Sequence, residues 1–171
     1  MSITLYSASV PVFSALLENL LGWLDKAEAH AATKKFEPAI YLDSRLAPDM
    51  LPLRNQVQIA CDTAKFFVAR LAGVDAPKFD DKEASLADLR TRVRATLDFI
   101  ASVPAERIEG TEAKEVTLPR RTGAVVMQGQ AYLTQFALPN FFFHVTTTYA
   151  LLRHAGVDIG KQDYLGAPQP R

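Results

Sequence analysis

Residues 50–73 read MLPLRNQVQIACDTAKFFVARLAG and carry the most informative pattern in the chain. Apolar side chains recur there at spacings of three and four residues, which is typical of a helix, and they cover more than one narrow stripe. A helix that is apolar on more than one side tends to lie centrally in a bundle. We therefore predict a central helix over about 50–71, ended by Gly73, with apolar positions Leu53, Val57, Ile59, Ala60, Ala64, Phe67, Val68 and Leu71.

A second amphipathic pattern covers residues 10–24 and fades into an Ala- and Lys-rich polar end at 26–35. Ser9 is suited to cap the start of this helix, and Pro11 is tolerated in a first turn because its missing N–H is not needed there. The sequence therefore predicts a long first helix that begins near Ser9.

A third helix is expected from Ser85 to about Ser102, because Ser85 and Asp88 stand three residues apart as in a capping box. The connection before it, residues 75–83, is charged and contains a proline, so we expect a linker there. The polar side chains of the third helix are expected to line its solvated side, namely Arg90, Arg92, Arg94 and Asp98.

Residues 105–130 interrupt the helical pattern. Residues 114–118 alternate at period two, which favours an irregular β-hairpin or a long loop, and Pro119 is expected to interrupt any regular pairing. A fourth helix is predicted from about Leu138 to Leu152, stopping at Gly156. The tail, 157–171, is expected to wrap the other helices without a helix of its own.

These patterns predict an all-α fold, a four-helix bundle with an irregular or β-hairpin insertion before its last helix. Each helix of about 20 residues would be roughly 30 Å long. A chain of 171 residues is the size of one ordinary domain, so we expect residues 1–171 to form a single helical-bundle domain. The long connections leave the topology open.

Composition excludes several classes of function. The chain has 19 Lys and Arg against 19 Asp and Glu, with no basic block, so we expect no nucleic-acid and no membrane partner. One cysteine makes no internal disulfide, no apolar run reaches the roughly 18 residues of a membrane span, and no secretory signal is recognisable. We therefore expect a cytoplasmic protein.

Function in a helical bundle is usually built from polar side chains that project inward from facing helices. The second helix offers Gln58 and Asp62 at i, i+4, and the fourth helix offers Asn140, His144 and Thr148. If the two faces meet, Gln58, Asp62, Asn140 and His144 converge in one pocket that binds an unidentified small molecule.

Each of these residues also has a structural interpretation. His144 is then a core histidine that needs only hydrogen-bond partners, and Asn140 caps the fourth helix. Asp62 is then an ion-pair partner of Lys65 or Arg54. Cys61 is expected to be a small buried apolar residue.

Several motifs together resemble a known bacterial family. They are RLAPDM at 45–50, QVQIACD at 56–62, PNFFFHV at 139–145, RHAG at 153–156 and GKQDYLG at 160–166. The chain resembles the domain of unknown function 1993, in the DinB/YfiT-like superfamily of proposed metalloenzymes. The resemblance implies a DinB-like four-helix bundle in up-down-down-up order, commonly found as a homodimer, and it implies no known reaction.

The metal site of that superfamily uses one His on the second helix and a His-x-x-x-His pair on the fourth. Aligned on the end of the fourth helix, the pair falls on Asn140 and His144, and the other His falls at about Gln58 or Ile59. Only His144 is retained as a metal ligand, and amide oxygens bind transition metals weakly. We therefore expect a degenerate metal site with no cofactor, although a divalent metal at His144 stays an alternative.

Three functions follow from these observations. The preferred one is a small-molecule-binding or regulatory bundle, without metal. The alternative is a divalent-metal-assisted transferase or hydrolase that uses His144 and Asp62. A third is a dimerisation module whose pocket no longer has a role.

Overall fold

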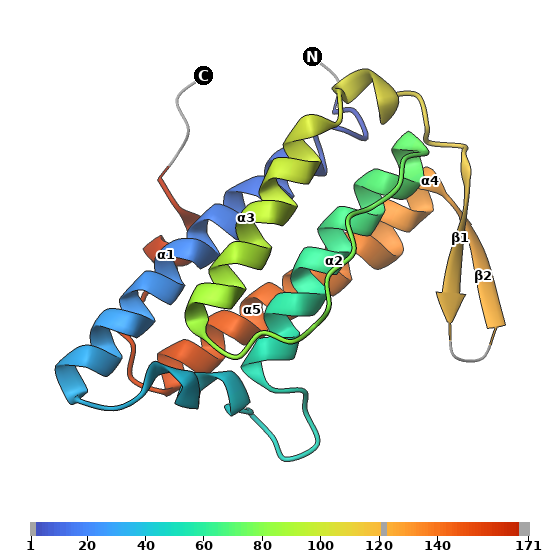
Figure 1. The fold of residues 1–171 in the computed structure, drawn as a ribbon. Helices are drawn as coiled ribbons and strands as arrows, with labels where there is room; N and C mark the ends of the chain where they lie inside the picture. Colours follow the sequence, from blue (N-terminus) through green and yellow to red (C-terminus); the bar gives the residue numbers. More distant parts are fainter. Residues whose placement is uncertain (1–2, 121–122, 168–171) are drawn as a thin grey trace.

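The structure, a computed structural model, describes residues 3–120 and 123–167 and is mainly helical. Four long helices lie side by side in Figure 1: α1 (Val10–Lys34), α2 (Leu53–Ala72), α3 (Leu86–Ser102) and α5 (Leu138–His154). Two short 3₁₀ segments connect them, η1 (Pro38–Asp43) and η2 (Ala105–Arg107). No helix among the described residues is long and apolar enough to cross a membrane.

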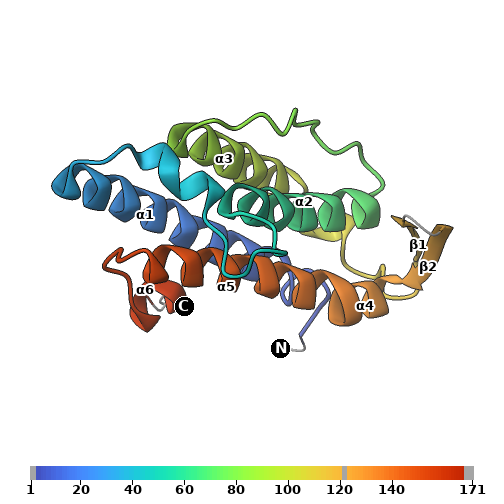
Figure 2. The same cartoon turned by 90° about the horizontal axis from the view of Figure 1, so that it is seen from below.

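Helix α2 packs against both α3 and α5, and α1 packs against the same two helices from the other side (Figures 1 and 2). Three phenylalanine rings join α1, α2 and α5 in the core. The ring centroid of Phe13 on α1 lies 4.8 Å from that of Phe141 on α5 and 5.5 Å from that of Phe67 on α2. The prediction that α2 is apolar on several sides is confirmed, because the side chains facing each neighbour are fully buried, including Val57, Ala60, Cys61, Ala64, Phe67 and Val68.

The predicted helix boundaries are largely confirmed. Pro11 lies in the first turn of α1, and Gly73 ends α2 with a φ of +67°, a conformation that favours glycine. Ser85 caps α3 by accepting the backbone N–H of Asp88 at 3.1 Å. Ser9 is the N-cap residue of α1, as predicted, but its hydroxyl makes no capping hydrogen bond and donates to the carbonyl of Leu5 instead.

A β-hairpin precedes the last helices and extends from the end of the helical body (Figure 1). Strands β1 (Glu115–Arg120) and β2 (Gly123–Gln128) pair antiparallel, with Pro119 opposite Ala124. The expectation that Pro119 interrupts the pairing is wrong. Each strand of a two-stranded ribbon has one free edge, and a proline whose nitrogen lies at that edge removes no ladder hydrogen bond.

The last helical run begins earlier than predicted. It starts with α4 (Gly129–Ala131), continues through the π-helical turn η3 (Tyr132–Ala137) and leads directly into α5. The predicted start at about Leu138 is therefore wrong, because the wide turn η3 precedes it and accommodates Pro139, a residue without an N–H, inside a continuous helix. Gly129 is required at the junction, because a Cβ there would lie 2.2 Å from the carbonyl oxygen of Thr111.

The prediction for the tail is wrong in one respect. Residues 161–165 form a short helix, α6 (Lys161–Leu165), which lies against α1. Trp23 donates to the carbonyl of Asp163 at 3.0 Å, and Lys26 contacts the Asp163 carboxylate at 2.6 Å. Residues 168–171 lie outside the described part of the chain.

Candidate functional site

Helices α2 and α5 face each other through a row of polar contacts. Gln56 pairs with His144, Thr63 with Asn140 and Arg70 with Tyr132, each at 2.7–2.8 Å. The partner numbers fall along η3 and α5 as they rise along α2, so α2 runs antiparallel to this continuous helical run. Residues seven apart share one side of a helix, so Gln56, Thr63 and Arg70 form the side of α2 that faces α5.

The pair formed by Gln56 and His144 has a defined protonation state. The Gln56 side-chain amide donates to the carbonyl of Leu51 at 2.7 Å, so its oxygen is the atom that faces Nδ1 of His144, also at 2.7 Å. Nδ1 therefore carries the proton that the oxygen accepts. Burial lowers the pKa of His144 to about 4, so the imidazole is neutral at pH 7.

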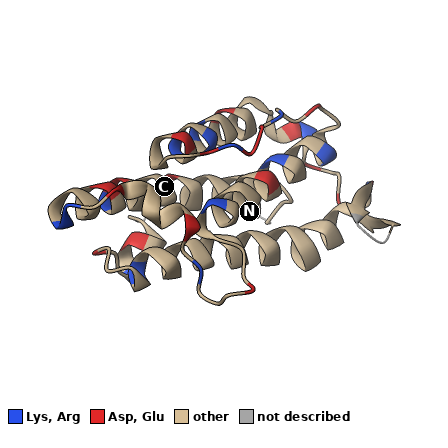
Figure 3. Cartoon of the chain, turned by 60° about the horizontal axis from the view of Figure 1, so that its bottom comes forward, with Lys and Arg blue, Asp and Glu red and all other residues tan. Residues whose placement is uncertain are grey.

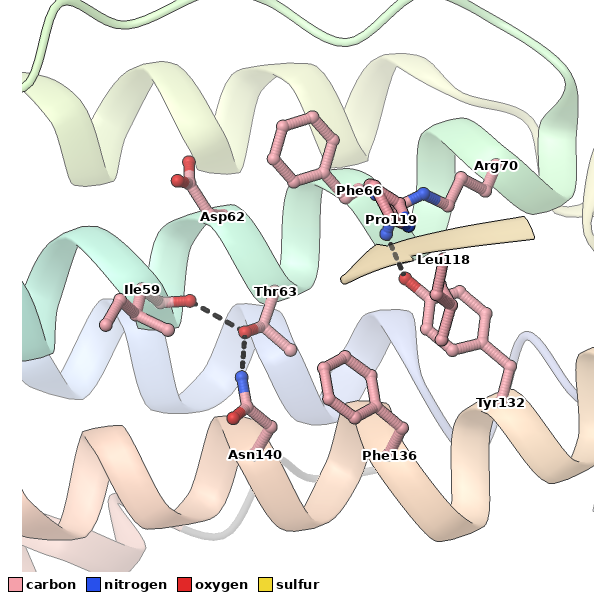
Figure 4. A pocket seen from close by; sticks show the side chains of 10 residues that line it. All are labelled: Ile59, Asp62, Thr63, Phe66, Arg70, Leu118, Pro119, Tyr132, Phe136 and Asn140. Atoms are coloured by element: carbon pink, nitrogen blue, oxygen red, sulfur yellow. Dashed lines mark hydrogen bonds between the residues drawn. The ribbon is translucent and has the colours of Figure 1, made fainter. Parts of the chain in front are cut away.

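Asn140 presents a free acceptor. Its amide nitrogen donates to the hydroxyl of Thr63 at 2.7 Å, and that hydroxyl donates to the carbonyl of Ile59 at 2.7 Å. This chain of donors fixes the orientation of the Asn140 amide (Figure 4). Its Oδ1 has no hydrogen-bond partner in residues 3–120 and 123–167.

A cavity of about 190 Å³ lies next to this amide, between α2, β1 and the wide turn before α5 (Figure 4). Its walls are mostly apolar, and rings from two helical segments face each other across it. The lining residues are Ile59, Asp62, Thr63, Phe66, Arg70, Leu118, Pro119, Tyr132, Phe136 and Asn140.

A buried ionic network lies on the other side of α2, where α3 and the linker meet it. The Arg92 side chain is 2% exposed and contacts Asp62 at 2.9 Å, Asp81 at 2.6 Å and Glu83 at 2.8 Å. Lys65 contacts the same oxygen of Asp62, Oδ1, at 2.8 Å. The network fastens the linker to α2 and α3.

Burial raises the pKa of Glu83, but hydrogen bonds from Arg92 and Gln58 outweigh this and hold it below its usual value. Burial alone would lower the pKa of Arg92, but its carboxylate partners raise it. The expectation that Arg90 and Arg92 are solvated is wrong, because both reach across to carboxylates on neighbouring segments.

The structure separates the residues that the sequence grouped. Asp62 and Asn140 both line the cavity, but Gln58 bonds Glu83 on the linker side and His144 bonds Gln56. Two residues along a helix correspond to a turn of 200°, so Gln56 and Gln58 lie about 160° apart around α2. The four residues therefore do not converge in one pocket. Thr148 is fully buried and donates to the carbonyl of His144 in its own helix.

Of the structural interpretations, the ion pair between Asp62 and Lys65 is confirmed, and Cys61 is buried as expected. Arg54 instead contacts Asp43. Asn140 caps no helix, since the helical run begins at Gly129.

Sequence reasoning missed Arg70, Tyr132 and Phe136. Arg70 was detectable in principle, because it stands seven residues after Thr63 on the same side of α2. Tyr132 and Phe136 lie between the predicted hairpin or loop, 105–130, and the predicted start of the fourth helix at about Leu138.

The family described as "Domain of unknown function (DUF1993)" matches residues 5–165. The chain belongs to the DUF1993 family. A crystal structure of a DinB family member protein from Shewanella denitrificans is similar over 98% of this chain and 94% of that chain, with 44% sequence identity and a TM-score of 0.91. No curated protein matches.

The metal site that the DinB resemblance implies does not fit the residues of this DUF1993 chain. The α2 residue facing His144 is Gln56, not Gln58 or Ile59, and its amide oxygen is bound to the imidazole N–H. Asp62 is directed to Arg92 and Lys65. Within the described residues, no three His, Cys, Asp or Glu side chains are grouped so that they could hold a metal ion.

Proposed function

We propose that this DUF1993 chain binds a small organic molecule in the cavity between α2, β1 and α5. The observation that carries the proposal is the combination of facing aromatic walls with a polar atom, Oδ1 of Asn140, that is fixed in place and has no partner among the described residues. Ligand sites commonly combine apolar walls with a few oriented polar groups.

The size of the cavity limits the ligand. A volume of about 190 Å³ is slightly larger than the roughly 150 Å³ of an apolar cavity that holds benzene. We therefore expect a molecule with one ring and one or two small substituents. Phe66, Tyr132 and Phe136 line the cavity and supply apolar contacts for such a ring.

Neutral His144 has a supporting role in this proposal. It is absent from the cavity lining and binds Gln56, so it holds α2 and α5 together beside the cavity. The antiparallel contacts of α2 with η3 and α5, and the packing of α1 against α3 and α5, support our proposal that α1, α2, α3 and α5 form a four-helix bundle in up-down-down-up order.

Ligand-observed NMR with a library of single-ring fragments tests the proposal. Ile59 lines the cavity and is half-buried, so Ile59→Trp fills the cavity with a larger ring. The matched control is Ala87→Trp on the exposed side of α3. We expect fragments that bind the wild type and the control but not Ile59→Trp. Fragments that bind all three proteins equally, or no fragment binding at all, would contradict the proposal.

We also propose that the chain forms a homodimer. No Lys, Arg, Asp or Glu lies between Gly129 and Leu152, and the ribbon from the hairpin through α4 into α5 is correspondingly tan in Figure 3. Phe142 on this segment is 38% exposed and lines one groove with Leu165 on α6, which is 58% exposed. An uncharged apolar face suits a second copy, because two identical charged faces would repel each other. Light scattering should give twice the chain mass of 18.8 kDa, and a monomeric mass would remove the proposal.

A further inference from the structure

Arg70 on α2 differs in its partners from Arg90 and Arg92, the two buried arginines of α3. Arg90 binds Asp25 and Glu28, and Arg92 binds three carboxylates. Arg70 has no carboxylate partner anywhere in residues 3–120 and 123–167, although it is half-buried. A cation removed from water usually has an anionic partner. The Arg70 guanidinium is therefore available to bind an anionic group of a ligand.

Aromatic rings and one hydrogen bond hold the Arg70 guanidinium in place. Its Nη1 donates to the Tyr132 hydroxyl at 2.8 Å, and its central carbon lies 4.9 Å from the Phe66 ring centroid and 5.9 Å from that of Tyr132. Figure 4 shows the group turned back beside Phe66 at the edge of the cavity. A guanidinium has five N–H donors, so further donors remain for a planar anion such as a carboxylate.

The end of the cavity away from Arg70 carries hydrogen-bond acceptors instead of a cation. Asn140 and Asp62 line that end; Oδ1 of Asn140 accepts no hydrogen bond from the described residues, and Arg92 and Lys65 both contact Oδ1 of Asp62. Thr63, the partner of Asn140, stands seven residues before Arg70, which corresponds to about 10 Å along α2. An anionic group is therefore favoured only at the Arg70 end, and a hydrogen-bond donor is favoured at the Asn140 end.

We propose that the ligand is an aromatic carboxylate with a hydrogen-bond donor at the far side of its ring. The carboxylate binds the Arg70 guanidinium, the ring lies among Phe66, Tyr132 and Phe136, and the donor meets Oδ1 of Asn140. This inference rests on the proposed function and narrows its ligand class.

The first test compares two probes on the wild-type chain by isothermal titration calorimetry. Para-hydroxybenzoate carries both groups, whereas para-hydroxybenzyl alcohol has the same ring and donor without the charge. A hydrogen bond to a charged group at a partly buried site makes the acid bind roughly 10- to 100-fold more tightly than the alcohol. Equal affinity, or no binding of the acid at concentrations on the order of 10 mM, overturns the inference.

Substitutions of Arg70 test whether this residue causes the preference for the acid over the alcohol. Arg70→Gln removes the charge and should abolish the preference for the acid, and Arg70→Lys should restore part of it because the charge returns without the planar fork. Arg94→Gln is the control, since Arg94 is exposed on α3 and its loss changes the net charge equally. An unchanged preference in Arg70→Gln, or an equal loss in Arg94→Gln, overturns the inference. If Arg70→Gln fails to fold, the comparison of acid and alcohol on the wild type decides.

The result also separates this inference from the proposed function. One outcome is that neutral single-ring fragments bind the wild type but not Ile59→Trp, while the acid binds no more tightly than the alcohol. This outcome leaves the proposed function intact and refutes the ligand class. A failure of every single-ring fragment to bind refutes both.

Discussion

His144 gives the most quantitative prediction. Burial lowers the pKa of its folded imidazole to about 4, against about 6.5 in the unfolded chain. Below pH 6.5 the unfolded state therefore takes up a proton that the folded state does not. The difference of 2.5 pH units corresponds to at most about 3 kcal/mol of stability, which is present above pH 6.5 and is lost as the pH falls toward 4.

The assay is urea denaturation at several pH values, followed by circular dichroism. Between pH 7.5 and pH 4.5, wild type should lose about 2 to 3 kcal/mol more of its free energy of unfolding than His144→Asn, which keeps a donor for Gln56 but does not titrate. His154→Gln is the control, because His154 is exposed in the last turn of α5. The reasoning is refuted if wild type and His144→Asn show the same pH dependence.

Arg92→Met should lower the free energy of unfolding by about 3 kcal/mol, because it leaves the Glu83 carboxylate, only 10% exposed, without its cation; a loss below about 1 kcal/mol in urea denaturation contradicts the buried network. Cys61 is fully buried and its burial raises the thiol pKa to about 12, so a colorimetric thiol reagent should react only after denaturation; rapid reaction of the native protein is the opposing result. Gly129→Ala should destabilise by about 2 kcal/mol, since its Cβ would meet the backbone of Thr111; an unchanged melting temperature argues against that contact.

Local patterns in the sequence predicted the helices but not which of their sides meet. The period of apolar residues and the signals at Pro11, Gly73 and Ser85 place α1, α2 and α3 because each depends on a few neighbouring residues. The start of the last helical run was not predictable, because a π-helical turn, a feature without a simple sequence signal, lets the helix continue through Pro139.

The site was only partly predictable for a related reason. The sequence groups Asp62 and Asn140 in one pocket with Gln58 and His144, and the first two line the cavity. The partner of Asp62, however, is Arg92 on the next helix. An arginine in an amphipathic pattern has the same local signature whether it faces water or a buried carboxylate. The β1 wall of the cavity likewise depends on how the hairpin folds back against α2, which no local pattern encodes.

A crystal structure of the full chain soaked with single-ring fragments tests the central claim most directly. We predict a fragment in the cavity between α2, β1 and α5, with a polar atom within hydrogen-bond distance of Oδ1 of Asn140. Fragments found only elsewhere, for example in the larger hollow of about 620 Å³ under the linker beside Phe79, would contradict the claim.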